Sequence, residues 1–222
     1  MLVHIPNILP AATLIEVRAL LAELSFDPGR KTAGWHAREV KSNDQAAPGP
    51  ALDRLRTILA TALSANEVVR AMALPVRILP PLISRTGPGQ GYGTHVDDAF
   101  MGSTNGLRTD LSVTIFLSDP ASYDGGELVA ETPSGEDAVK FPAGDAVLYP
   151  STTLHRVETV TRGERLVAVT WIESRVRDAA AREILFDLDR ARRALFAKDG
   201  KSDAFDLVSK SYSNLLRRWG GR

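Results

Sequence analysis

The chain has 222 residues, which suits one domain with a sizeable core. Lysine plus arginine number 27 and aspartate plus glutamate also number 27, so no basic field indicates a nucleic-acid or anionic-membrane partner. The absence of cysteine excludes disulfides, thiol catalysis and iron–sulfur clusters. We see no signal-peptide pattern and no apolar run of about 18 residues, so we expect a cytoplasmic protein.

Residues 1–75 are predicted to form an N-terminal helical buttress. Thr13 and Glu16 fit a capping box, which would begin the first helix. Residues 41–45 are polar and read as a loop. Apolar residues at helical spacing over 52–72 predict one continuous second helix.

The pattern changes at residue 76 to short strand-like runs separated by turns, the first of them over 76–82. About eight such runs at a spacing of roughly 8–12 residues, within 76–175, predict an antiparallel sandwich or jelly roll. Helical spacing returns in 176–222, a C-terminal helical segment that we expect to buttress the barrel. Leu216 and Trp219 near its end would suit a homodimer contact. The predicted fold class is mainly β with flanking helices.

Two of the four histidines form a candidate metal site with one carboxylate. His95 and Asp97 would point to the same side of a strand, because side chains alternate along it. His155, in another strand-like run, is the candidate third ligand. Two histidines and a carboxylate leave three adjacent positions open, as in non-haem Fe(II) oxygenases. His4 and His36 have no carboxylate at ligand spacing and are predicted to be structural or surface residues.

Arg165 begins the strand-like run after His155, across a turn. An antiparallel hairpin would bring it beside His155, with its guanidinium in the same cavity. A planar fork of donors suits a carboxylate, such as the far end of a 2-oxoglutarate co-substrate. The alternative is an exposed strand arginine that pairs with a neighbouring glutamate.

Several longer segments support a family assignment. They are residues 41–43, 92–97, 108–112, 123–128, 142–145, 148–151, 154–157, 161–165 and 182–189. In this order they resemble the PKHD-type hydroxylases, bacterial relatives of the prolyl 4-hydroxylase catalytic domain among the Fe(II)/2-oxoglutarate dioxygenases. The resemblance covers nearly the whole chain. It implies a double-stranded β-helix, cupin-like core with Fe(II) on His95, Asp97 and His155, and 2-oxoglutarate on Arg165. It also implies L-ascorbate as the supporting reductant.

The chain departs from this family at one position near the expected site. Thr86 stands nine residues before His95, where the family commonly has a tyrosine that helps to hold the 2-oxoglutarate carboxylate. The hydroxyls of Thr86, Ser112 and Thr170 are candidate replacements, and Tyr92 is a further candidate contact.

The resemblance implies that O₂ and 2-oxoglutarate are consumed, that succinate and CO₂ are released, and that a substrate C–H bond is hydroxylated. The substrate could be a peptide, a free amino acid or a small metabolite, and family members are associated with iron uptake and siderophores. Residues 100–108 are predicted to form a lid or substrate loop.

Two other classes of function remain open. A metal-dependent hydrolase or isomerase on a cupin-like barrel would need a general base near the metal, for which Asp98 and Glu127 are the candidates. Strand alternation, however, turns Asp98 away from His95 and Asp97. A non-catalytic sensor of iron or 2-oxoglutarate could instead regulate a partner through the terminal helices.

Overall fold

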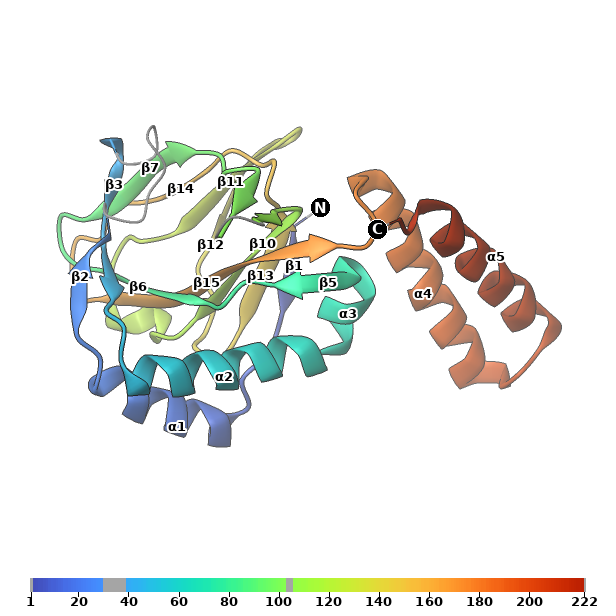
Figure 1. Cartoon of the computed structure of the whole chain (residues 1–222), viewed down its shortest axis with the longest axis horizontal. Coiled ribbons are helices and arrows are strands. Elements are labelled where there is room, and N and C mark those ends of the chain that lie inside the picture. Colours follow the sequence, from blue (N-terminus) through green and yellow to red (C-terminus); the bar gives the residue numbers. More distant parts are fainter. Residues whose placement is uncertain (1, 30–38, 103–105, 222) are drawn as a thin grey trace.

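The computed structural model describes residues 2–29, 39–102 and 106–221. Two antiparallel sheets form its centre, with helices below them and a helical hairpin to one side (Figure 1). The larger sheet has the order β1 (Val3–Ile5), β13 (Ala146–Pro150), β10 (Leu111–Phe116), β15 (Arg165–Ser174), β6 (Leu82–Thr86), β4 (Asp44–Ala46), β2 (Phe26–Pro28), and β5 (Pro75–Ile78) pairs with β15. The smaller sheet has the order β12 (Gly135–Val139), β11 (Leu128–Thr132), β14 (His155–Val157), β7 (Gly91–His95), β3 (Lys41–Ser42). These sheets and helices confirm the predicted mainly β core with flanking helices.

The two faces of strand β15 have different surroundings, the cavity on one side and the hydrophobic core on the other. Its alternate residues Arg165, Val167 and Val169 face the cavity between the sheets. Ala168 and Ile172 face the other way and join the main hydrophobic core. Because both faces of the strand are covered, nearly every position is apolar or buried.

Helices α1 (Ala11–Ala22) and α2 (Pro50–Ala65) cover the outer face of the larger sheet (Figure 1). Their leucines at helical spacing pack into the same core cluster as the strand residues. The predicted capping box is wrong, because α1 begins directly after Pro10 and has no side-chain cap. The single continuous second helix is also wrong. Asn66 is extended, ends α2 and caps α3 (Glu67–Ala73) by accepting a hydrogen bond from the amide of Val69.

The N-terminal segment contributes strands as well as helices. Residues 41–45, predicted as a loop, form most of β3 and β4, which join different sheets. Further along, the strand predicted over 76–82 is interrupted. It is divided into β5 and β6 around Pro80 and Pro81, which lack the N–H groups that a continuous ladder needs.

The C-terminal helices α4 (Ala179–Asp199) and α5 (Asp203–Trp219) pack against each other and project from the end of β15 (Figure 1). Helix α4 contacts α3, and its residue Phe186 joins the main hydrophobic core, so α4 packs against the core as predicted while α5 packs on α4. Leu216 and Trp219 pack within their own chain, in a cluster around Val176 and Leu185. None of the helices in the described ranges is long and apolar enough to cross a membrane.

Candidate metal centre

Three potential metal ligands meet on the inner side of the smaller sheet. His95 is the last residue of β7, His155 is the first of β14, and the two are direct partners in the antiparallel pairing of these strands. Their rings lie 4.3 Å apart. One ligand atom from each histidine and one from Asp97 all lie within 4.8 Å of one another. This donor set fits Fe(II), because it has the types of the facial triad.

Backbone carbonyls orient both imidazoles. Nδ1 of His95 lies 2.8 Å from the carbonyl oxygen of Gly93, and Nδ1 of His155 lies 3.0 Å from that of Thr153. A carbonyl can only accept, so each Nδ1 carries the proton and each Nε2 is left to bind a metal. Burial, helped by the nearby His155 ring, lowers the pKa of His95 to about 4. The neutral form required of a ligand is therefore favoured at neutral pH.

A β-bulge in β7 brings a second ring to the metal side. Tyr92 pairs with Val157 and His95 pairs with His155, so β7 has one more residue than β14 between these pairs. Tyr92 and His95 consequently stack, with ring centroids 3.6 Å apart. Burial raises the pKa of Tyr92, so its hydroxyl stays protonated. Tyr92, one of the residues predicted to contact the co-substrate, thus lies beside the candidate metal ligand His95.

Serine hydroxyls hold Asp97. Ser112 donates to a carboxylate oxygen of Asp97 at 2.5 Å, and its oxygen lies 2.7 Å from the hydroxyl of Ser151. Ser112 therefore orients Asp97, a candidate metal ligand, and does not line the cavity. The hydroxyl of Thr170 is bonded to the Leu79 carbonyl at 2.6 Å, on the helix-facing side of β15. Strand alternation accounts for this, since Thr170 is an odd number of positions from Arg165.

Arg165 approaches the triad from the opposite sheet. The predicted hairpin with His155 is wrong, because β14 belongs to the smaller sheet whereas β15 belongs to the larger one. Arg165 pairs instead with Thr86 on β6, and both side chains line the cavity. The arginine is 2% exposed, and its Nε has no hydrogen-bond partner among the residues that the structure describes. Burial lowers its pKa. A buried guanidinium with an unsatisfied donor fits a bound carboxylate.

The triad and Arg165 line one cavity of about 690 Å³. This volume lies within the range of about 300–1,000 Å³ that is usual for small-molecule sites. Its walls combine polar groups from β3, β4 and β6 with apolar side chains such as Leu79, Leu82, Met101 and Trp171. Strands β8 (Phe100–Met101) and β9 (Leu107–Arg108) form a small hairpin at one side of it. In the segment predicted to be a lid, residues 103–105 lie outside the described residues.

Several cavity residues were not predicted from the sequence. Tyr149 is buried, lines the cavity and places its ring edge-on to His155, with centroids 5.3 Å apart. Lys41 of β3, Gln45 of β4 and Asn43 between these strands line the cavity. Their period-two spacing was a usable signal, but the polar composition of the segment favoured a loop.

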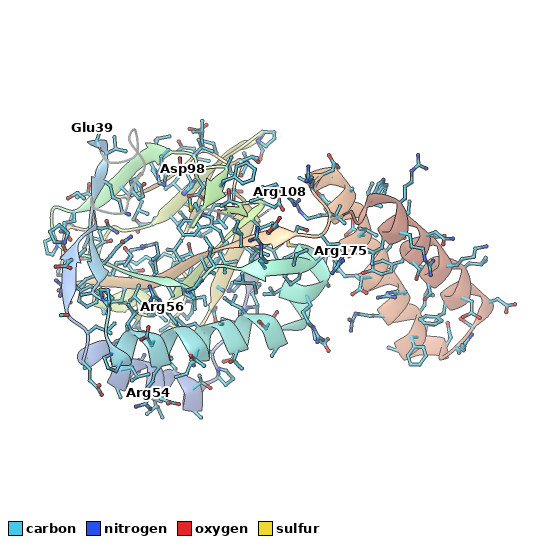
Figure 2. All side chains as sticks on the ribbon, in the orientation of Figure 1. Glu39, Arg54, Arg56, Asp98, Arg108 and Arg175 are labelled. Carbon is cyan, nitrogen blue, oxygen red and sulfur yellow. The ribbon has the colours of Figure 1, made fainter. Side chains whose placement is uncertain are left out.

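The remaining candidates among the described residues are not part of the cluster of His95, Asp97 and His155. Asp98 is exposed at the cavity edge, near the smaller sheet (Figure 2). Glu127 does not line the cavity, and its carboxylate lies 3.9 Å from Lys140. His4 stacks on Phe141 at 3.8 Å and bonds Asp145, which is a structural role. His36 lies outside the described residues.

Known proteins resemble this chain over its whole length. Residues 81–173 match the 2OG-Fe(II) oxygenase superfamily, and residues 179–221 match the PKHD-type hydroxylase C-terminal domain. A PKHD-type hydroxylase of Synechococcus elongatus is 50% identical over 221 residues, 99% of each chain. One of Maricaulis maris is 47% identical over 219 residues, also 99% of each chain.

Solved structures share the fold. A Pseudomonas putida prolyl-4-hydroxylase matches with a TM-score of 0.55 and 22% identity, over 78% of this chain and 92% of that one. A Trichoplax adhaerens prolyl hydroxylase, solved with a peptide fragment, matches with a TM-score of 0.57 and 14% identity, over 78% and 83%. The jelly-roll type of core is thereby confirmed. With the sequence identities above, these findings show that the chain belongs to the PKHD-type hydroxylases, within the 2OG-Fe(II) oxygenase superfamily.

Proposed function

We propose that this dioxygenase binds Fe(II) through His95, Asp97 and His155 and binds 2-oxoglutarate through Arg165. It hydroxylates a C–H bond of a primary substrate and releases succinate and CO₂. The observation that carries the proposal is the position of Arg165. This arginine is buried and has an unsatisfied Nε, and it lines the same cavity as the triad from the opposite sheet.

The residues of the chain have separate tasks in this proposal. Arg165 anchors the distal carboxylate of 2-oxoglutarate, and Thr86 lies beside it in the same wall of the cavity. The two histidines present Nε2, because their Nδ1 atoms are held by carbonyls. Ser112 fixes Asp97. The iron and the co-substrate supply the oxidising chemistry when bound, while the protein supplies binding and orientation.

The competing hydrolase or isomerase has less support. Such an enzyme needs a base that can reach a metal-bound water. Glu127 lies outside the cavity and faces Lys140, and Asp98 is exposed at the edge. The sensor hypothesis is not favoured by the arrangement either, since the C-terminal helices α4 and α5 project to one side of the sheets (Figure 1) and their described residues do not line the cavity.

The proposal is tested by anaerobic titration of the protein with Fe(II) and then with 2-oxoglutarate, followed by visible absorption. We expect a weak charge-transfer band that is absent in His155→Ala and weakened in Arg165→Met. Arg162→Met is the matched control, because Arg162 is exposed and pairs with Asp124 on the surface. Iron binding without any band on addition of 2-oxoglutarate would contradict the dioxygenase assignment.

Turnover is the second readout. Succinate formation from 2-oxoglutarate under O₂ should need Fe(II) and should be sustained by L-ascorbate, the reductant implied by the family resemblance. A role in iron or siderophore homeostasis, a cytoplasmic location and a homodimer rest on the sequence and the resemblance alone and stay predictions.

A further inference from the structure

A tyrosine and a threonine of the larger sheet contribute hydroxyl side chains to the cavity. Tyr149 of β13 and Thr114 of β10 both line it, and they are 2% and 3% exposed. Their strands are neighbours in the sheet, and neither residue belongs to the cluster of candidate metal ligands. Burial of a polar group costs folding free energy, so two buried hydroxyls in a cavity wall indicate a surface that binds a ligand.

The two hydroxyls have more donors than they can use on each other. Burial raises the pKa of Tyr149, so the phenol keeps its proton, and a hydrogen bond with the Thr114 side chain opposes this shift. Each hydroxyl has one O–H donor, and a hydrogen bond between them uses only one of the two. The pair can therefore donate one further hydrogen bond to an acceptor in the cavity.

Strand pairing places the hydroxyl pair between the candidate metal ligands and Arg165. Tyr149 is the direct partner of Ser112, whose hydroxyl bonds Asp97. Thr114 lies two residues further along β10, in the direction in which the antiparallel β15 runs back toward Arg165. The charge of Arg165 also acts on the Tyr149 hydroxyl. A ligand that spans from the metal ligands to the guanidinium would therefore pass along this pair.

We propose that Tyr149, supported by Thr114, binds the distal carboxylate of 2-oxoglutarate together with Arg165. A carboxylate has about four acceptor positions, and a bidentate guanidinium occupies about two of them, so acceptor positions remain for a hydroxyl donor. Thr86 is the competing hydroxyl, because it pairs with Arg165 from β6, on the side of β15 opposite to β10. This inference rests on the proposed function, since it assumes 2-oxoglutarate at Arg165.

The test compares 2-oxoglutarate with 2-oxopentanoate, which has a methyl group in place of the distal carboxylate. Both are titrated under nitrogen into the Fe(II)-loaded protein, and the charge-transfer band reports binding of each. Tyr149→Phe should weaken 2-oxoglutarate binding at least about tenfold, as expected for one hydrogen bond to a charged group, and should change 2-oxopentanoate binding less than about twofold. Thr114→Val should shift the ratio of the two affinities in the same direction.

Tyr212→Phe is the matched control, because Tyr212 is a buried tyrosine of α5 that does not line the cavity. It should leave the ratio unchanged. The ratio is read on one protein sample, so a loss of folded protein does not alter it, whereas loss of a contact to the distal carboxylate does.

Three results are decisive. An unchanged ratio in Tyr149→Phe overturns the inference, as does a change in Thr86→Val alone, which would assign the carboxylate to Thr86. Equal weakening of both ligands in Tyr149→Phe also overturns it, since the hydroxyl would then act on the metal end of the site. Absence of 2-oxoglutarate binding in the unmodified protein would instead refute the proposed function itself.

Discussion

Gly126 makes room for Arg165, the arginine that we propose as the anchor of the co-substrate. Its φ is +70°, and an added Cβ would lie 2.9 Å from Cδ of Arg165 and 3.1 Å from Cε2 of Tyr123. A side chain at this position would displace the arginine stem or strain the backbone. Steric crowding beside Arg165 therefore explains the glycine at position 126, in the conspicuous glycine pair 125–126.

Gly126→Ala should lower the affinity for 2-oxoglutarate at least about tenfold, because the guanidinium moves by part of an ångström or more. Titration of the charge-transfer band measures this. Gly135→Ala is the matched control, since Gly135 also has a positive φ but nothing lies within 4 Å of the added Cβ. Equal 2-oxoglutarate affinity in the two variants would show that displacement of Arg165 is not the cause.

The buried Lys41 should lower the free energy of unfolding by an amount that depends on pH. Burial lowers its pKa from 10.5 to about 8. Between these two values the unfolded chain holds a proton that the folded protein has released, so the free energy of unfolding rises with pH there. At pH 7 the protein bears the full cost of the buried charge, at most about 3 kcal/mol.

Lys41→Met should therefore be more stable than the unmodified protein at pH 7, and this advantage should shrink between pH 8 and 10.5. Urea unfolding of both metal-free proteins at pH 7 and pH 10 measures this advantage. Subtracting their free energies of unfolding at each pH cancels the contribution of groups that titrate in both proteins. Lys210→Met, with an exposed lysine, should show no such trend. A constant difference between Lys41→Met and the unmodified protein would mean that the lysine is not buried as a cation.

At the scale of elements, the helical hairpin of α4 and α5 has a hydrophobic cluster of its own. Its cluster contains Leu185, Tyr212 and Trp219 and includes Leu74 and Val176 from the rest of the chain, while Phe186 of α4 joins the main core. Within α4, Arg192 and Arg193 also form ion pairs with the buried Asp189. The cavity lies in the β core and shares none of these residues.

Leu185→Ala should thus lower the free energy of unfolding by about 2–5 kcal/mol, the usual cost of removing a fully buried leucine. The affinity for 2-oxoglutarate should stay unchanged. Leu207→Ala, at a site 60% exposed on α5, is the control and should change stability by less than about 0.5 kcal/mol. Loss of 2-oxoglutarate affinity in Leu185→Ala would show that the hairpin supports the cavity after all.

For the whole molecule, the site is divided between the two sheets. The smaller sheet carries His95 and His155, and the larger sheet carries Arg165. A metal with bound 2-oxoglutarate would therefore link the sheets, and a ligand that binds only the folded state stabilises it. Saturation at about 100 times the dissociation constant contributes about 2.7 kcal/mol.

Thermal unfolding should accordingly show two increments, one on addition of the metal and a second on addition of 2-oxoglutarate. Mn(II) under nitrogen avoids turnover in this measurement. Arg165→Met should keep the metal increment and lose the second one. If Arg165→Met retained both increments, the co-substrate would be held by other residues.

The sequence by itself determined the parts of this protein that local pattern encodes. Alternation predicted the strands, helical spacing predicted α1 and α4, and the ordered motifs around His95 and Gly126 indicated the family. These features depend on neighbours along the chain, so they can be read from it. Lys41, Asn43 and Gln45 were misread as a loop because polar strands have no apolar alternation to reveal them.

Only the tertiary structure decided how the site is assembled. Strands β13, β14 and β15 alternate between the two sheets, so Arg165 reaches the cavity from the wall opposite His155 although one turn separates β14 from β15. Ser112 likewise turned out to bond Asp97, and Thr170 to face the helices. Sequence separation does not specify which sheet a strand joins, because that choice is set by pairing between distant segments and by burial of both faces.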